Sequence, residues 1–302
     1  MIVKPLAFHV NNRLAALQFT TVARDTLEYI SGDRAMKAGL LEVREVSESG
    51  SVNQLFVINT APQPVFFMDG DILIGAKQNR VINTSMLIGA GSKTTIAVTC
   101  VEGGRWQMVS KRFSPSDYVA PSKLRSGKSQ QVHTNLQNKR GYLSDQGDIW
   151  DRVASYQHLH EVRSPTSSLS DIFEARRADH GDFLASFTNE PDANGCAFFI
   201  DNDLVCVDVF NRRDIYAEYF PKLLRGIGLE MVFLAPTGKE LGRAEAEYKT
   251  LDFLDTMDTV ERSAFPGAAL GTDPRFQTET VTGFGLYVDE QLVHFSALRL
   301  GA

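Results

Sequence analysis

Short apolar segments separated by turn residues are the feature that most constrains the fold of this chain. Between residues 40 and 106, apolar side chains recur at short spacing, and Pro62, Gly70 and Gly89 interrupt them. This arrangement is typical of strands joined by turns rather than of helices. It predicts strands over residues 40–46, 51–59, 64–68, 71–74, 80–83 and 94–102.

The second half of the chain has helical periodicity. Ile149, Val153 and Tyr156 are spaced by four and three residues, which places them on one face of a helix. Ser168 and Asp171 have the S-x-x-D spacing that caps a helix start. Further helical faces run over residues 215–227 and 244–254; Pro221 lies within the first and is expected to bend or delay it.

Two stretches of this second half predict β-hairpins. Residues 195–210 alternate around Asp201 and Asn202, which tolerate the left-handed backbone of a tight turn. Residues 283–298 repeat the same order of features, with Gly283 in the place of Gly195 and Asp289 in the place of Asp201. Two copies of one hairpin in a shared antiparallel sheet would explain the likeness, although alternation around an acidic turn is also common.

Residues 112–145 differ from both halves, because basic residues stand among Ser, Gln, Asn and Gly with few apolar anchors. We interpret this segment as a mobile basic connection, with a lid that contacts an anion as the alternative. A short helix over residues 116–124 is expected, interrupted by Pro121.

These patterns together predict an α+β fold. An N-terminal β-rich, sandwich-like layer (1–111) would precede the basic connecting segment (112–145) and a helical half with antiparallel hairpins (146–302). With 302 residues, 43% of them hydrophobic, the chain can build two moderate domains or one continuous domain.

Composition excludes several classes of function. A formal net charge of -6 disfavours nucleic-acid and membrane-surface binding, which need an excess of Lys and Arg. No apolar run approaches the ~20 residues of a membrane span, and no signal peptide is recognisable. Three sparse cysteines favour a reducing cytoplasm. His158 and His160 are two residues apart, so they do not predict a metal site, and no cofactor is indicated.

The densest polar cluster lies between Asp69 and Asn83. Asp69 and Asp71 are candidate catalytic acids or bases, and Lys77 and Arg80 are candidate ligands for a phosphate or carboxylate. The amide side chains that could orient a base, sugar or amide group are Gln78, Asn79 and Asn83. The alternative is an ordinary exposed loop tip, because neither GxxxxGK[ST] nor GxGxxG is present.

A second cluster follows the strand expected over residues 94–102. Glu102, Arg105 and Trp106 flank two glycines, so Arg105 could bind an anion and Trp106 could stack on a ring. The alternative is a surface ion pair beside a tryptophan that covers the core. Cys100 is expected to be a buried small hydrophobic residue, and Asp208 becomes a candidate acid or base only if it is buried.

The run Phe67-Met-Asp-Gly-Asp-Ile-Leu-Ile-Gly-Ala-Lys-Gln-Asn-Arg-Val-Ile-Asn83, followed by Cys100-Val-Glu-Gly-Gly-Arg-Trp106, resembles a bacterial domain family. That family is named for association with ADP-ribosylglycohydrolases and rhodanese-phosphatase superfamily proteins. The resemblance extends from about Leu40 to Leu298 and implies ADP-ribose or nucleotide-linked metabolism. By this resemblance, the candidate functional residues of this chain are Asp69, Asp71, Lys77, Gln78, Arg80, Asn83, Glu102, Arg105 and Trp106.

Two functions follow as hypotheses. The first is binding or processing of an ADP-ribose-like or other phosphorylated nucleotide, with the cations on phosphate, Trp106 on the base and Asp69 or Asp71 as acid/base. The alternative is a non-catalytic interaction module that recruits a partner enzyme. A metal-dependent hydrolase using Asp69, Asp71 and Asp208 has less support, because no His joins them at ligand spacing.

Overall fold

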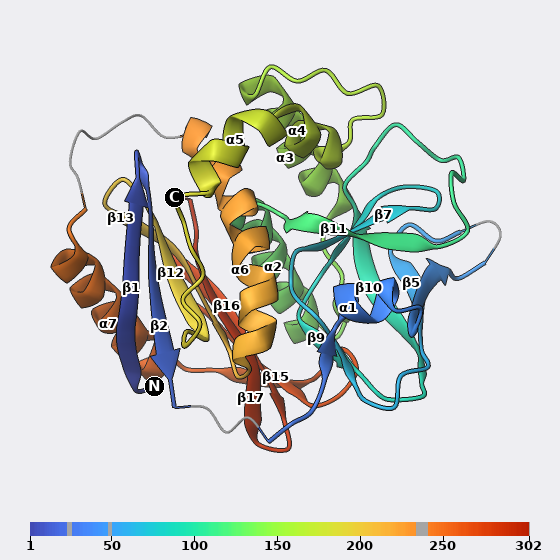
Figure 1. The fold of residues 1–302 in the computed structure, drawn as a ribbon. Coiled ribbons are helices and arrows are strands. Elements are labelled where there is room, and N and C mark those ends of the chain that lie inside the picture. The colour runs from blue at the N-terminus through green and yellow to red at the C-terminus, as the bar shows by residue number, and fades with distance from the viewer. Residues whose placement is uncertain (23–25, 48–49, 234–240, 302) are drawn as a thin grey trace.

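The computed structural model describes residues 1–22, 26–47, 50–233 and 241–301, and it has the α+β architecture predicted from the sequence (Figure 1). One large antiparallel sheet contains strands from both ends of the chain. Its strands, in spatial order, are β1 (Val3–Asn11), β2 (Leu14–Thr21), β12 (Gly195–Ile200), β13 (Asp203–Phe210), β17 (Gln291–Arg299), β16 (Val281–Val288), β15 (Thr272–Gln277) and β14 (Ser263–Pro266). Because β2 pairs with β12, the first strands of the chain lie in the same sheet as the late hairpins. The division at residues 111 and 145 stays a prediction.

The two predicted hairpins occupy the centre of this sheet. β12–β13 and β16–β17 pair through β13 and β17, which confirms the shared antiparallel sheet. Gly195 lies opposite Phe19 on β2, and Gly283 lies opposite Phe276 on β15. A Cβ atom would be 2.4 Å from the Phe19 ring at Gly195 and 2.2 Å from the Phe276 ring at Gly283. Each glycine therefore leaves room for the aromatic ring of the neighbouring strand.

An approximate twofold relation extends through the pairing of the hairpins. Asp208 pairs with Ser296, and these residues hold equivalent positions in the two copies. The register of each hairpin shifts at the same point, after Phe198 in one and after Leu286 in the other. The axis of the repeat thus passes between Asp208 and Ser296.

Helices cover both faces of the large sheet. α6 (Arg213–Gly228) packs Tyr219 and Leu223 against one face, which includes Phe198. α7 (Arg243–Thr259) packs Phe253 against the opposite face, which includes Phe199. Successive side chains of a strand point to opposite faces, so β12 is apolar throughout because both of its faces are buried. Both predicted helices are present, the predicted face of α6 is buried, and Pro221 lies inside α6. The face predicted for the second helix is wrong, because Ala244, Tyr248 and Leu251 are exposed. The residues that α7 buries are Ala246, Thr250, Phe253, Leu254 and Met257.

Two smaller sheets build the other part of the molecule. The six-stranded sheet has the order β11 (Phe113–Val119), β7 (Asp71–Gly75), β8 (Arg80–Ile82), β10 (Lys93–Cys100), β5 (Gln54–Asn59) and β4 (Leu41–Glu45). The three-stranded sheet has the order β3 (Ile30–Ser31), β6 (Val65–Phe67) and β9 (Met86–Ile88). Side chains such as Val57, Val65 and Ile82 join both sheets in one apolar core. All six strands predicted between residues 40 and 102 are present.

The remaining helices lie around these sheets. They are α1 (Gly32–Lys37), α2 (Ser122–Gln137), α3 (Gln146–Leu159), α4 (Leu169–Ala175), α5 (Arg177–Leu184) and a 3₁₀ helix (Leu229–Phe233). The Ser168 hydroxyl accepts a hydrogen bond from the Ser170 amide, so the predicted start of α4 is confirmed.

The predicted helix over residues 116–124 is wrong. Residues 113–119 form β11, which pairs with β7, and α2 begins only at Ser122, with Pro121 at its N-cap. A proline is tolerated before the first helical turn, because no backbone donor is needed there. α2 is a polar helix with buried Arg125 and Lys128, so it has no apolar stripe for sequence periodicity to reveal.

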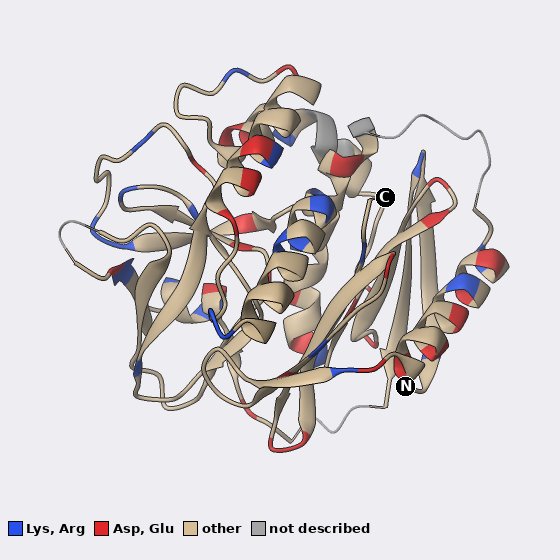
Figure 2. Cartoon of the chain, turned by 180° about the vertical axis from the view of Figure 1, so that it is seen from behind, with Lys and Arg blue, Asp and Glu red and all other residues tan. Residues whose placement is uncertain are grey.

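Charged residues of both signs are dispersed along the chain in Figure 2, and α7 carries acidic and basic residues side by side. Two ion pairs join them, Arg243 with Glu247 and Lys249 with Glu245. None of the described helices is long and apolar enough to cross a membrane.

Candidate functional site

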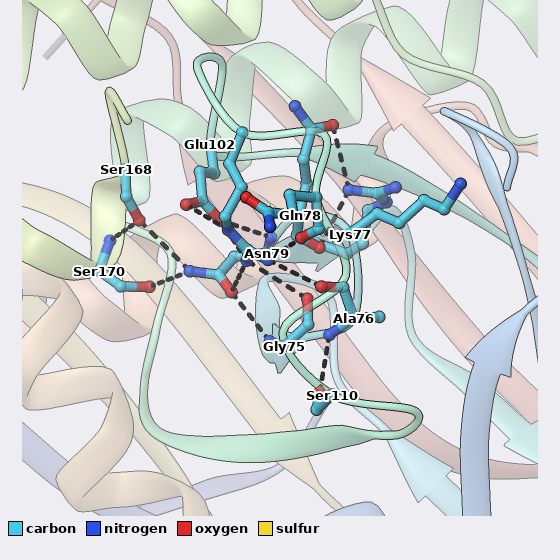
Figure 3. A network of polar contacts seen from close by, with 12 residues as sticks. Gly75, Ala76, Lys77, Gln78, Asn79, Glu102, Ser110, Ser168 and Ser170 are labelled. Atoms are coloured by element: carbon cyan, nitrogen blue, oxygen red, sulfur yellow. Dashed lines mark hydrogen bonds and ion pairs between the residues drawn. The ribbon is translucent and has the colours of Figure 1, made fainter. Parts of the chain in front are cut away.

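The two motifs singled out in the sequence lie side by side at one end of the six-stranded sheet. β7 and β8 form a hairpin whose turn is residues 76–79, and β8 pairs with β10 so that Arg80 faces Cys100. The Val101 amide donates to the Asn79 carbonyl over 3.0 Å. The turn and the loop that follows β10 are therefore adjacent, and Figure 3 shows their polar contacts. We call residues 103–112, between β10 and β11, the recognition loop.

Glu102 and Arg105 form the centre of this network. Arg105 Nε donates to Glu102 Oε1 over 2.8 Å and Nη2 donates to Glu102 Oε2 over 2.6 Å. Its other hydrogen bonds go to the carbonyls of Gly75, Ala76 and Gln107 and to the side chain of Asn79. Burial alone would raise the pKa of Glu102, but hydrogen bonds from Arg105 and the Asn79 amide lower it below its ordinary value. The Arg105 guanidinium thus already bonds protein groups on all sides.

Asn79 connects the turn to α4. Its side-chain nitrogen donates to Ser168 Oγ over 3.3 Å and to Ser170 Oγ over 3.2 Å (Figure 3). Its side-chain oxygen accepts from the Gly75 amide over 2.9 Å. An isolated β-bridge between Glu102 and Ser168 joins the same segments. The turn, the recognition loop and the start of α4 are thereby held as one unit.

The recognition loop is also bonded to the turn along its length. The Val109 amide donates to the Ala76 carbonyl over 3.0 Å, and the Ala76 amide donates to Ser110 Oγ over 2.9 Å. On the other side, the Gly104 amide donates to the Thr166 carbonyl over 2.7 Å. Ala76 has φ +43, a conformation that this tight turn imposes. The loop is therefore fixed at both edges.

Arg80 and Lys77 flank Trp106. Arg80 is wholly buried and donates to the Gln78 carbonyl over 3.0 Å, while Glu45 lies 3.5 Å away. The Arg80 guanidinium lies 5.7 Å and the Lys77 ammonium 5.3 Å from the centre of the Trp106 indole. Trp106 itself remains 47% exposed. Of the predicted ligand-binding residues here, Trp106 and the half-buried Lys77 reach the surface.

Trp150 was missed by the sequence analysis and belongs to this surface. It projects from α3 beside Gly103, where a Cβ atom would lie 3.6 Å from Trp150 Nε1, and it is 39% exposed. The helical periodicity of α3 could have indicated its exposure. Trp150 falls outside the apolar face formed by Ile149, Val153 and Tyr156, so its indole lies away from the core. Of the two tryptophans of the chain, Trp106 lies within the recognition loop and Trp150 lies beside its first residue.

The predicted catalytic residues lie at the opposite end of the β7–β8 hairpin. Asp69 is wholly buried and forms ion pairs with Arg125, 3.1 Å away, and with Lys128. Asp71 accepts from Lys222 Nζ over 2.7 Å and from Tyr219 over 2.7 Å. These carboxylates are paired and screened from solvent, and their catalytic role stays a prediction.

Asn83 lies at the same buried end of the hairpin. Its side chain donates to the Tyr142 carbonyl over 2.9 Å and accepts from Thr99 over 2.8 Å. It is thus separated from Lys77 and Trp106 by the length of β8.

A family comparison covers almost the whole chain. Residues 5–298 match the model of the ARPP-1 domain, the ARG and Rhodanese-Phosphatase-superfamily-associated Protein domain. The chain belongs to this family. Comparisons with curated proteins and with solved structures gave no match. The family name records association with other proteins and assigns no reaction.

The ARPP-1 domain contains a second buried cluster that the sequence analysis treated as isolated residues. Asp208 accepts two hydrogen bonds from Arg125, over 2.7 and 3.1 Å, and lies 3.4 Å from His294 Nε2. His294 Nδ1 is 2.9 Å from Ser85 Oγ. Asp208 is therefore buried, as a candidate acid or base would have to be.

The chemistry of this Ser85–His294–Asp208 arrangement in the ARPP-1 domain is limited by its surroundings. The rings of Phe210 and Phe284 pack on His294, which is wholly buried. Burial would raise the pKa of Asp208, but Arg125 holds it well below its ordinary value; burial lowers the pKa of His294. All three side chains are buried, and together they form an ion and hydrogen-bond network closed to solvent.

Metal and thiol chemistry find little support among the described residues of the domain. No group of three or more His, Cys, Asp or Glu side chains there is placed to hold a metal ion. Burial raises the pKa of the Cys100 thiol to about 11, so it is a thiol rather than a nucleophilic thiolate at neutral pH. The surface formed by the recognition loop and Trp150 is the strongest candidate site.

Proposed function

We propose that this domain recruits a partner protein through the recognition loop and Trp150. The observation that carries this proposal is the exposure of Trp106 within the loop and of Trp150 beside it, while the Arg105 and Ser110 side chains of the loop are engaged within the protein. Met108 and Val109 in the same loop are 46% and 65% exposed. Tryptophan is enriched among the residues that dominate binding energy at protein interfaces. A loop that is fixed before binding loses little entropy when a partner docks.

The charge of the loop favours an acidic partner surface. Residues 103–112 contain no acidic residue. Arg105 is already paired with Glu102, so the exposed cations of the loop are Lys111 and Arg112, and Arg112 also lies 3.2 Å from Glu42. The Arg112 side chain is 70% exposed. Together with the family's association, this supports a partner of the ADP-ribosylglycohydrolase or rhodanese-phosphatase class that presents an acidic, partly apolar segment.

Replacing Trp106 with alanine should weaken binding of that partner by about 30-fold or more, which corresponds to about 2 kcal/mol for a dominant interface residue. Isothermal titration calorimetry with the purified partner protein from the same organism measures the change. Trp150→Ala should also weaken binding. Tyr248→Ala is the matched control, because Tyr248 is an exposed aromatic residue (68%) on α7. Equal affinity of wild type and Trp106→Ala would refute partner recruitment by this surface.

A second candidate function is binding of an ADP-ribose-like or other phosphorylated nucleotide at the same surface. It is favoured by one observation: the exposed Trp106 indole has the Lys77 ammonium within 5.3 Å, so a base could stack near a cation that meets phosphate. Titration of ADP-ribose in the same calorimeter distinguishes the functions. Saturable binding that Trp106→Ala removes would support the nucleotide, and absence of binding at millimolar ADP-ribose would exclude it.

We also propose that the protein resides in the cytoplasm. The support is that Cys100, Cys196 and Cys206 are free, buried thiols, as a reducing compartment maintains them.

A further inference from the structure

A hollow of about 270 Å³ lies between α7, the β12–β13 turn and the ends of β16 and β17. Its floor is apolar and is formed by Leu204, Phe253, Met257 and Val281, all of them buried. Pockets for drug-sized ligands have volumes of about 300–1,000 Å³, so this hollow suits a smaller molecule with an apolar body.

The hollow contains one cation, Arg299, that has no ion-pair partner among the described residues. The Arg299 guanidinium lies 5.7 Å from the centre of the Phe253 ring, and within the described parts of the chain it forms no hydrogen bond or ion pair. Lys249, which also lines the hollow, already pairs with Glu245 over 2.9 Å and donates to the Asn202 carbonyl over 2.7 Å. Arg299 is thus the group available to a carboxylate, which a guanidinium can bind through two parallel hydrogen bonds.

Two carboxylates complete the rim. Asp203 and Asp252 line the hollow and are exposed, and neither comes within ion-pair distance of Arg299 or of any other described cation. A polyphosphate would be repelled by these two acids, whereas an ammonium group would be attracted to them. The hollow therefore combines an anion-binding group, a cation-binding rim and an apolar floor.

We propose that this hollow binds a small zwitterion with an apolar side chain, such as a free aliphatic or aromatic α-amino acid. Its carboxylate pairs with Arg299, its ammonium faces Asp203 and Asp252, and its side chain covers Phe253 and Val281. This site is separate from the recognition loop, and it does not depend on the function proposed for that loop.

Calorimetric titration with L-leucine, L-methionine and L-phenylalanine tests the proposal. At least one of them should bind the wild-type protein, and Arg299→Met should weaken that binding by at least ~10-fold, the effect of a lost charge-assisted hydrogen bond. Because the Arg299 side chain forms no hydrogen bond or ion pair with another described residue, and methionine keeps an apolar chain over Phe253, Arg299→Met should keep the wild-type unfolding curve. Arg44→Met is the control, since Arg44 is an exposed arginine on β4.

Two analogues of leucine test the zwitterion itself. Both 4-methylpentanoate, which lacks the amine, and 3-methylbutylamine, which lacks the carboxylate, should bind more weakly than leucine. Equal binding of leucine and either analogue would overturn the zwitterion assignment. Failure of all three amino acids to bind at millimolar concentration, or binding that Arg299→Met leaves unchanged, would overturn the site.

Discussion

Replacing Arg125 with methionine should lower the free energy of unfolding by about 3–5 kcal/mol, the cost of removing one partner from a buried ion pair. Arg125 extends from α2 between the sheets, where it is 1% exposed. It pairs with Asp69 on one side and with Asp208 on the other. Methionine has a similar length but no charge, so both wholly buried carboxylates would lose this cation. Urea denaturation followed by circular dichroism measures the change.

An exposed arginine provides the comparison for this prediction. Arg177 pairs with Asp117 and Glu174, but its side chain is 53% exposed. Arg177→Met should change the free energy of unfolding by no more than about 1 kcal/mol, since solvent screens surface ion pairs. If Arg125→Met were as stable as Arg177→Met, the α2 ion pairs would not hold the sheets together.

Replacing Glu102 with glutamine should lower the free energy of unfolding by about 2–3 kcal/mol at neutral pH, because charge-assisted hydrogen bonds to a buried group are lost. Glutamine preserves the size of the side chain but cannot neutralise Arg105 or accept both of its hydrogen bonds. The recognition loop would lose its central support, so partner binding should weaken as well. Chemical denaturation and calorimetry measure the two effects.

The difference in unfolding free energy between wild type and Glu102→Gln should depend on pH, and the sign of that dependence follows from the pKa of Glu102. The folded-state pKa of Glu102 lies below its ordinary value of 4.5, so its stabilisation is present above that pH and is lost as the pH falls. The gap between wild type and Glu102→Gln should therefore be largest near pH 7 and shrink in acid. Glu42→Gln is the control, because among the described residues Glu42 forms its ion pair with the exposed Arg112. A gap that stays constant down to about pH 3, below that ordinary value, would contradict the proposed role of the Glu102 charge.

Features of this fold that depend on residues close together in the sequence could be predicted. The β-strands between residues 40 and 102 follow from apolar spacing and turn residues, and the N-cap at Ser168 follows from a local hydrogen bond. The hairpin repeat was visible through Gly195 and Gly283. What the sequence could not show is the reason for these glycines, because Phe19 and Phe276 meet them only through strand pairing.

Features that depend on residues far apart in the sequence could not be predicted. Arg125 and Lys128 look like solvated charges in a polar segment, because their partner Asp69 is more than fifty residues away. The same limit applies to the candidate site. Proximity of Lys77 and Trp106 was a reasonable expectation from adjacent motifs, whereas the engagement of Arg105 by backbone carbonyls depends on the exact path of the loop.

Amide hydrogen–deuterium exchange on the partner complex tests the central claim most directly. If the recognition loop and Trp150 form the docking surface, exchange should slow on partner binding in residues 103–112 and at the start of α3. The amides of α7, on the far face of the large sheet, should exchange at the same rate in the free and bound protein. Protection confined to α7 or another region, with residues 103–112 unchanged, would contradict the account.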